Sequence, residues 1–279
     1  MALKTLLVCL TTPEHAETLM KLTVPLARKH NAHLVGLHTI EALLIYPGIA
    51  MHIPDTVYAA FNDAQKEEAE KIKAVFKRYT QSEDFPSEFR LVRTNGTSAA
   101  NRIVESARAA DLVVMSAEDR EADRVDQRNA QVQVIRESGR PVIVVPHGYE
   151  GPEIGENIVL GWSDTREAAR AAHDLLILAE VGANVTVLRV GGQGKDALAD
   201  SDAIDLTETL ARHRLYPTFE LRDPAGDDVA DVLGQVAFEK GADMIATGAL
   251  GHSRAYDFVI GATTYRLLRD AKLPVMFSK

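Results

Sequence analysis

The sequence contains the same order of strand-like and helix-like segments twice, and this repeat constrains the fold more than any other feature. Short apolar runs suited to buried strands alternate with longer segments whose apolar residues recur at helical spacing. Matching positions align between the halves: Ile158 corresponds to Leu6, and Asp243 corresponds to Asp111. A strand followed by a helix, repeated, is typical of a parallel sheet. The sequence therefore predicts an α/β fold of two repeated, open, five-stranded parallel-sheet domains.

The apolar patterns also give approximate element boundaries. In the first half, strands are expected near residues 6–10, 33–39, 89–93, 111–116 and 141–146, and helices near 14–30, 61–79, 97–109 and 128–138. In the second half, strands are expected near residues 157–162, 185–190, 218–222, 243–247 and 274–278, with a helix near 227–239. Pro25 lies inside the first helical pattern, so either the helix kinks there or its boundary lies elsewhere.

A segment rich in glycine and proline, residues 148–155, separates the halves and is typical of a linker. We expect domains at residues 1–149 and 155–279. The offset between matching positions is 152 at the first strand (158 minus 6) and 132 at the fourth (243 minus 111), so the first half carries an insertion of 20 residues (152 minus 132). We place this apolar insertion at residues 41–61. It could line a ligand pocket or form a partner surface, but extra packing over the first domain is the favoured interpretation.

Charge and cysteine content exclude several classes of protein. The formal net charge of -9 argues against binding to nucleic acid or to an anionic membrane as the main activity. Cys9 is the one cysteine in 279 residues, which excludes an intramolecular disulfide and a cysteine-based zinc site and favours a reducing compartment. No apolar stretch approaches the roughly 20 residues that a membrane helix needs. We expect a cytoplasmic protein.

A glycine-rich segment lies between a predicted strand and a predicted helix of the second half. Gly248 and Gly251 open it, and Gly261 follows after nine residues and precedes Thr263 and Thr264. Glycine lets backbone N–H groups approach an anion, and a following helix N-terminus adds unpaired donors and the positive end of its dipole. The spacing is neither that of a Walker A loop nor that of a Rossmann fingerprint. The segment predicts a phosphate-binding loop of another kind.

On these residues the chain resembles the universal stress protein family in its tandem, two-domain form. The nucleotide-binding members of that family carry G-x-x-G, nine residues and then G-[ST] between the fourth strand and the last helix. Gly248, Gly251 and Gly261 match this pattern here. The resemblance spans nearly the whole chain and implies Rossmann-like domains of the adenine nucleotide alpha hydrolase type. It also implies that the two domains pair through their last strands, residues 141–146 and 274–278, and a further homodimer is possible.

The resemblance implies a site for ATP or AMP at the carboxyl ends of the strands of the second half, with Mg²⁺ possible alongside ATP. Val190 matches a position whose backbone contacts adenine. Two residues depart from the family, because Ser163 stands where an aspartate is expected and Ala262 where a serine is usual. A lost hydroxyl removes a hydrogen bond of about 0.5–1.5 kcal/mol. The expected binding residues are Gly248, Gly251, His252, Ser253, Gly261, Ala262, Thr263, Thr264, Ser163 and Val190.

The first half departs much further from the same pattern. The alignment places Ser116, Ala117, Glu118 and Asp119 on the first glycine loop, Arg128 and Asn129 on Gly261 and Ala262, Gln131 on Thr264, and Thr11 on the missing aspartate. Acidic side chains in place of glycines repel phosphate and block a close backbone approach. We predict that this half binds no nucleotide in the family's manner.

The sequence offers no motif for catalysis. There is no G-x-S-x-G elbow, and the superfamily's S-G-G-x-D and H-I-G-H motifs are missing. We therefore expect a sensor or signalling protein rather than an enzyme. Two alternatives stay open: a slow ATPase that uses His252, and a scaffold or apolar small-molecule binder that uses the 41–61 insertion.

Acidic residues gather at the starts of two predicted helices, among them Asp202 on one and Asp228 and Asp231 on the other. Carboxylates there complement the helix dipole, and this interpretation is favoured over a magnesium site. The histidines are scattered without the spacing of a metal-binding motif. We expect no metal site made by the chain alone.

Overall fold

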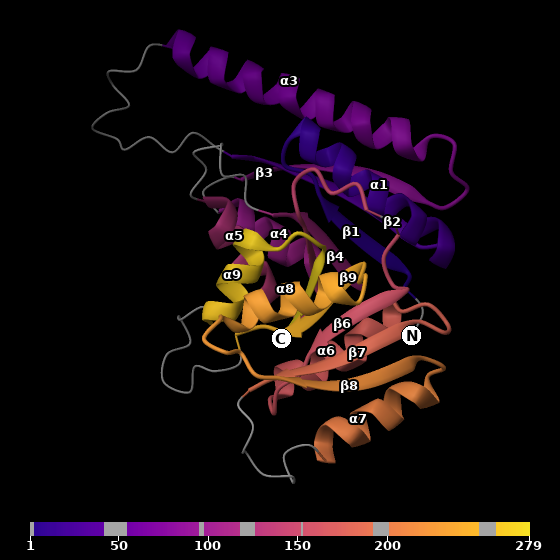
Figure 1. The fold of residues 1–279 in the computed structure, drawn as a ribbon. Coiled ribbons are helices and arrows are strands. Elements are labelled where there is room, and N and C mark those ends of the chain that lie inside the picture. The colour runs from indigo at the N-terminus through magenta and orange to yellow at the C-terminus, as the bar shows by residue number, and fades with distance from the viewer. Residues whose placement is uncertain are drawn as a thin grey trace.

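The computed structural model describes residues 3–41, 55–94, 98–117, 126–151, 153–191, 201–250 and 261–279. Within these ranges ten strands form one sheet, in the order β3-β2-β1-β4-β5-β10-β9-β6-β7-β8 (Figure 1). The strands of each half are parallel to one another and follow the same order, with the first strand between the second and the fourth. The predicted fold class is confirmed.

The elements lie within a few residues of their predicted positions, except where noted below. The strands are β1 Thr5–Cys9, β2 His33–Glu41, β3 Ser87–Thr94, β4 Leu112–Ser116, β5 Val142–Val145, β6 Asn157–Gly161, β7 Asn184–Val190, β8 Tyr216–Arg222, β9 Met244–Gly248 and β10 Val275–Ser278. The helices are α1 Pro13–His30, α3 Asp55–Thr80, α4 Ala99–Ala107, α5 Asp126–Glu137, α6 Arg166–Asp174, α7 Ser201–Arg212, α8 Val229–Glu239 and α9 Ala262–Asp270, with a 3-10 turn at Leu175–Ile177.

The two halves join through their last strands. β5 and β10 are antiparallel neighbours, with Val275 opposite Val144 and Phe277 opposite Val142. This pairing continues the sheet from one half into the other, as the resemblance to the family implied (Figure 1). The arrangement is that of a pseudo-dimer within one chain.

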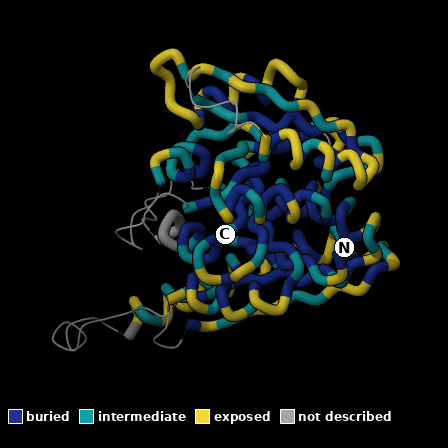
Figure 2. The backbone as a smooth tube through the Cα atoms, turned by 90° about the horizontal axis from the view of Figure 1, so that it is seen from below, coloured by how far each residue is buried: buried dark blue, intermediate teal, exposed yellow. Residues whose placement is uncertain are grey.

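Side chains alternate along the strands and supply two apolar layers, one on each face of the sheet. Leu6 and Val8 of β1 belong to the layer that packs against α1, α3, α6 and α7. Leu7 and Cys9 belong to the other layer, which packs against α4, α5, α8 and α9. Figure 2 shows the buried residues gathered along the sheet and the exposed residues on the outer helices and loops. Burial raises the pKa of the Cys9 thiol to about 12, so this cysteine stays protonated and unreactive.

The structure confirms the predicted bounds of the first helix and corrects the start of the second. Helix α1 runs unbroken from Pro13 to His30 with Pro25 inside it, so the idea that its boundary lies elsewhere is wrong. Helix α3 begins at Asp55, six residues before the predicted start at residue 61 (61 minus 55), and takes in the last part of the 41–61 insertion. Residues 42–54 of that insertion lie outside the described residues.

A duplicated aspartate holds the start of the first strand in each half. The Asp111 carboxylate accepts hydrogen bonds from the backbone N–H groups of Lys4 and Thr5, both at 2.9 Å. Asp243 accepts three such bonds, from residues 155, 156 and 157, at 2.7 to 2.8 Å. Burial raises the pKa of Asp243, and the three N–H donors only partly oppose this. The repeated Ala-Asp pair therefore has a structural role, at the edge of the sheet opposite the carboxyl ends of the strands.

No helix of the described part of the chain has the length and apolar content required to span a bilayer.

Candidate functional site

The carboxyl ends of three neighbouring strands of the second half lie at one edge of the sheet, where proteins of this architecture bind ligands in a crevice. β6 lies between β9 and β7, and all three run parallel, so their carboxyl ends share one edge of the sheet. Val190 ends β7 and Gly248 ends β9, while Ser163 lies two residues beyond β6. The predicted site residues 261–264 form the start of α9, which follows β9 in the chain. The structure thus brings together every predicted site residue that it describes. Gly251, His252 and Ser253 lie outside the described residues.

Gly248 is required by the fold itself. A Cβ atom at this position would lie 2.5 Å from the backbone nitrogen of Ala168 and 2.5 Å from the carbonyl carbon of Glu167. Both atoms belong to the first turn of α6, which packs directly against the end of β9. The first glycine of the predicted loop therefore permits contact between a helix and a strand. It carries little information about a ligand.

Gly261 differs from Gly248, because no close packing surrounds it among the described residues. It precedes α9 with φ -60° and ψ 139°, a conformation that any residue adopts. The nearest atom to a Cβ placed there is the Thr264 hydroxyl oxygen at 3.9 Å, an ordinary contact. Neither the backbone nor the described surroundings therefore require glycine at this position. A ligand that approaches the backbone closely would require it.

The N-terminus of α9 is open to an acceptor. No side chain of the described residues caps it, because Gly261 occupies the N-cap position. The first helical hydrogen bond runs from the N–H of Tyr265 to the carbonyl of Gly261, which leaves the N–H groups of residues 262 to 264 without a helical acceptor. These donors and the positive end of the helix dipole favour an anion at this point.

The two threonines of α9 differ in their surroundings. Thr264 is buried, and its hydroxyl accepts a long hydrogen bond of 3.5 Å from the N–H of Leu250. Leu250 has a φ of 63°, in the left-handed region, and this bond holds its N–H toward α9. Thr263 is half-buried and has no hydrogen-bond partner among the described residues. Of the two predicted hydroxyl donors, Thr263 is thus the one free to meet a ligand.

Val190 presents a backbone N–H to the crevice. Trp162, one residue beyond β6, donates to the carbonyl of Leu188 at 2.8 Å, and Gly191 donates in the other direction to the carbonyl of Arg222 at 2.9 Å. Since successive residues of a strand point their backbone groups to opposite sides, the N–H of Val190 points toward the β6 side. The pairing with β6 has ended there, and no partner for this N–H exists among the described residues. This is the backbone group expected to contact adenine.

Hydroxyls and a polar cluster replace the missing aspartate near the end of β6. Ser163 Oγ lies 3.2 Å from Thr165 Oγ1, which in turn accepts the N–H of Ala168 at 3.2 Å and caps α6. Next to it, Trp162 Nε1 donates to Asp202 at 3.2 Å, and Arg189 donates to both carboxylate oxygens of Asp202 at 3.1 and 3.2 Å. Sequence reasoning missed this cluster, because its members come from three separate elements and form no motif.

The corresponding place in the first half is filled by the chain's own side chains. Gln131 is buried, and its Nε2 donates to the carbonyl of Ser116 at 2.5 Å. The Ser116 hydroxyl lies 3.4 Å from that of Thr11. Ser116 occupies the place of Gly248, and Gln131 that of Thr264. These contacts support the prediction that the first half does not bind nucleotide. Glu118 and Asp119 lie outside the described residues, as do the side chains of Arg128 and Asn129.

The acids of α8 pair with an arginine of α9. Arg266 donates to Asp228 and, at 3.0 Å, to Asp231. Asp228 occupies the N-cap position of α8, but its side chain makes no capping hydrogen bond. The interpretation of these carboxylates as partners of the helix dipole alone is therefore incomplete. Among the described residues, no three His, Cys, Asp or Glu side chains are grouped as ligands of a metal ion.

These features define a class of protein: a duplicated, doubly wound α/β protein whose two halves share one sheet. The chain belongs to the universal stress protein family, whose model matches residues 2–146 and again residues 155–279. The predicted family and its tandem form are confirmed.

Solved structures with the same fold span both halves of the chain. A universal stress protein from Archaeoglobus fulgidus DSM 4304 is 15% identical with a TM-score of 0.73, over 98% of this chain and 96% of that one. A putative universal stress protein from Pseudomonas aeruginosa UCBPP-PA14 is 14% identical with a TM-score of 0.58, over 100% and 94%. A protein of unknown function from Pseudomonas aeruginosa PAO1 is 15% identical with a TM-score of 0.57, over 100% and 93%. At these identities the likeness shows the fold. The comparison with curated proteins gave no match.

Proposed function

We propose that this chain is an adenine-nucleotide-binding stress or signalling protein with its site in the second half. In this proposal, residues 155–279 form the nucleotide-binding domain, and residues 1–149 form a degenerate copy that supports it. The observation that carries the proposal is Gly261, a glycine that the described surroundings do not require, at the N-terminus of α9, which no described side chain caps. The ligand is ATP or AMP, with Mg²⁺ accompanying ATP.

In this proposal the phosphates and the adenine bind at opposite sides of the crevice. The phosphates lie at the start of α9, where backbone N–H groups, the helix dipole and the Thr263 hydroxyl favour negative charge. Adenine lies at the end of β7, where the free N–H of Val190 donates to it. Ser163 and Ala262 offer fewer side-chain hydrogen bonds to a nucleotide than the aspartate and serine usual in the family. Binding therefore rests mainly on the backbone.

The role is binding rather than turnover. Backbone N–H groups and hydroxyls hold phosphate but supply no base to activate a water molecule. β5 and β10 already pair with each other, so a homodimer of whole chains would need another surface. The proposed location is the cytoplasm, in line with the reducing compartment that a single, buried cysteine favours.

The substitution Gly261→Asp tests the proposal without damage to the fold. An aspartate fits the N-cap position, where it stabilises α9 by about 0.5 kcal/mol relative to glycine. The same carboxylate repels phosphate and blocks the backbone. We expect isothermal titration calorimetry to show a loss of ATP and AMP affinity of at least about tenfold, equivalent to 1.4 kcal/mol. Urea denaturation should show that the protein is no less stable.

The matched control is Ser98→Asp, which places the same charge at the N-cap of α4 in the first half. It should leave nucleotide affinity unchanged. Equal affinity of Gly261→Asp and wild type for ATP would refute the proposed site. Phosphate release from ATP by wild-type protein, above the rate of a protein-free control, would favour the slow ATPase instead.

A further inference from the structure

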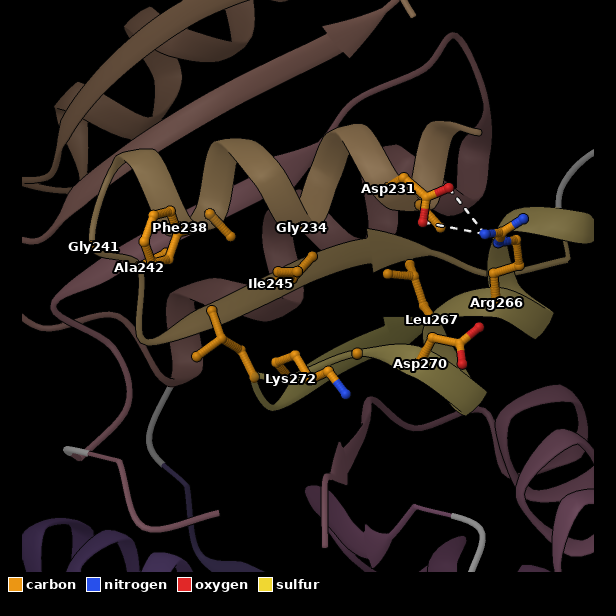
Figure 3. A pocket seen from close by; sticks show the side chains of 14 residues that line it. Asp231, Gly234, Phe238, Gly241, Ala242, Ile245, Arg266, Leu267, Asp270 and Lys272 are labelled. Atoms are coloured by element: carbon orange, nitrogen blue, oxygen red, sulfur yellow. Dashed lines mark hydrogen bonds and ion pairs between the residues drawn. The ribbon is translucent and has the colours of Figure 1, made fainter. Parts of the chain in front are cut away.

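A second cavity lies between α8 and α9, apart from the nucleotide crevice. Its volume is about 490 Å³, within the range of small-molecule pockets. Figure 3 shows the two helices as its walls and the start of β9 as its floor, with Ile245 between them. The crevice lies at the other end of β9, beyond Gly248. We refer to this cavity as the α8–α9 groove.

Small and apolar residues keep the groove open. Gly234 and Gly241 contribute no side chain to its wall, and a Cβ atom at either position would have no heavy atom within 4 Å. Ile245, Leu267 and Leu273 supply apolar surface from β9, α9 and the turn that precedes β10. An apolar lining of this kind favours an apolar ligand over water.

The first half carries hydrogen-bonded polar side chains at two matching positions. Gln133 and Arg140 stand where the second half has Arg266 and Leu273, at an offset of 133 (266 minus 133, 273 minus 140). Gln133 of α5 donates to Asn101 of α4 at 2.6 Å, and Arg140 donates at 3.2 Å to the carbonyl of Arg108, the residue that caps α4. The first bond links the two helices, and the second links α4 to the turn before β5. The two copies therefore differ here, because hydrogen-bonded polar side chains of the first half stand at positions that line the cavity in the second.

The charges on the lining leave one cation unpaired. Asp231 is paired with Arg266, as the dashed lines in Figure 3 show, and Asp270 is paired with Arg269. Lys272 is exposed and lines the groove, and within the described part of the chain no carboxylate pairs with it. A ligand with one negative charge would balance this ammonium group.

Phe238 adds an aromatic side chain to the edge of the groove. It is 88% exposed, an unusual state for a phenylalanine of a folded domain. A ligand chain in the groove would cover part of this ring and remove apolar surface from water.

We propose that the α8–α9 groove binds an amphipathic carboxylate, such as a medium-chain fatty acid. The hydrocarbon chain lies on Ile245, Leu267 and Leu273, and the carboxylate pairs with Lys272. This site is independent of the nucleotide crevice.

The test compares decanoate with the uncharged decanol by isothermal titration calorimetry on the full chain. Gly234→Leu fills the groove while it replaces glycine in a helix by a strong helix former, so the variant should fold. We expect it to lower the affinity for both ligands at least tenfold. Lys272→Met should lower the affinity for decanoate about fivefold and leave the affinity for decanol unchanged, because only decanoate carries a charge. Gln235→Leu adds the same side chain at the next position of α8, outside the lining, and should change neither affinity.

Equal decanoate affinity of Gly234→Leu and wild type would overturn the proposal. So would a wild-type dimer in sedimentation that Gly234→Leu abolishes, because the groove would then be an interface between two copies of the chain. ATP affinity should be the same in Gly234→Leu and wild type, so the outcome is separable from that of the nucleotide site.

Discussion

The two halves of the chain share a strand order but use the end of the fourth strand differently. In the second half, α6 packs so closely on the end of β9 that only glycine fits at position 248. In the first half, Ser116 takes this place and its hydroxyl faces Thr11. No described side chain caps the start of α9, whereas the Gln131 side chain of α5 donates to the Ser116 carbonyl. In the second copy the described residues leave backbone donors at the helix start, and in the first copy a side chain of the chain itself bonds to the backbone at the end of the fourth strand.

This difference shows that glycines in one motif can have different causes. Packing against α6 requires glycine at position 248, whereas no described neighbour requires glycine at position 261. A motif match weights the two residues equally. Only the geometry separates the glycine that packing against α6 requires from the one for which the described residues give no such requirement.

The largest expected effect is a loss of stability when the close packing of α6 on the end of β9 is disturbed. Gly248→Ala places a Cβ atom 2.5 Å from the backbone of α6, which cannot move like a flexible side chain. We expect a loss of about 3 kcal/mol in the free energy of unfolding, measured by urea denaturation.

The equivalent change in the first half, Ser116→Ala, serves as its control. It removes only the contact with the Thr11 hydroxyl and should cost about 1 kcal/mol. Equal losses for the two variants would show that the ends of β4 and β9 are packed alike, which would break the comparison.

The second prediction concerns Gln131. Gln131→Ala removes a buried hydrogen bond and leaves the Ser116 carbonyl unpaired, so we expect a loss of about 2 kcal/mol in denaturation. Thr264→Ala, at the matching position, removes a longer bond of 3.5 Å and should cost about 1 kcal/mol.

Calorimetry with Gln131→Ala also tests whether the first half can bind nucleotide. The variant should gain no nucleotide affinity in the first half, because the sequence still carries Glu118 and Asp119 where the second half has glycine-loop residues. A second ATP equivalent bound by Gln131→Ala would contradict the view that this half is degenerate for more than one reason.

The fold was largely readable from the sequence, because strand and helix periodicity repeats in each half. The register of Ala110-Asp111 with Ala242-Asp243 located both fourth strands, and the structure explains it by hydrogen bonds from these aspartates to the first strands. The 41–61 insertion was less readable, since residues 55–61 continue the helical pattern of α3.

The site was readable only in part. Glycine spacing located Gly248 and Gly261 but could not tell which one the fold requires, because that depends on the distance to α6. The free N–H of Val190 depends on where β6 ends relative to β7, a property of two strands and not of one. The pairing of Arg266 with Asp228 and Asp231 joins residues more than 30 positions apart, so no local sequence pattern predicts it.

The smallest expected effect concerns Asp243, which accepts one more backbone N–H bond than its counterpart Asp111. Burial raises the pKa of Asp243 above the ordinary value of 3.8. The folded protein therefore binds this proton more readily than the unfolded chain does. The contribution of the group to the free energy of unfolding then falls as pH rises from about 4 through the raised pKa, with a slope of at most about 1.4 kcal/mol per pH unit.

Urea denaturation between pH 4 and 7 should show this fall in wild type and a flatter dependence in Asp243→Asn, which cannot take up the proton. The difference should persist at about 0.5 M salt, because salt screens a buried group much less than surface charges. A wild-type pH dependence that Asp243→Asn reproduces in full would mean that the three N–H donors cancel the effect of burial, and a rise in wild-type stability with pH that Asp243→Asn lacks would mean that they outweigh it. Asp243 would then be a stabilising anion at neutral pH, and the start of β6 would owe its position to charge-assisted bonds rather than to burial in the core.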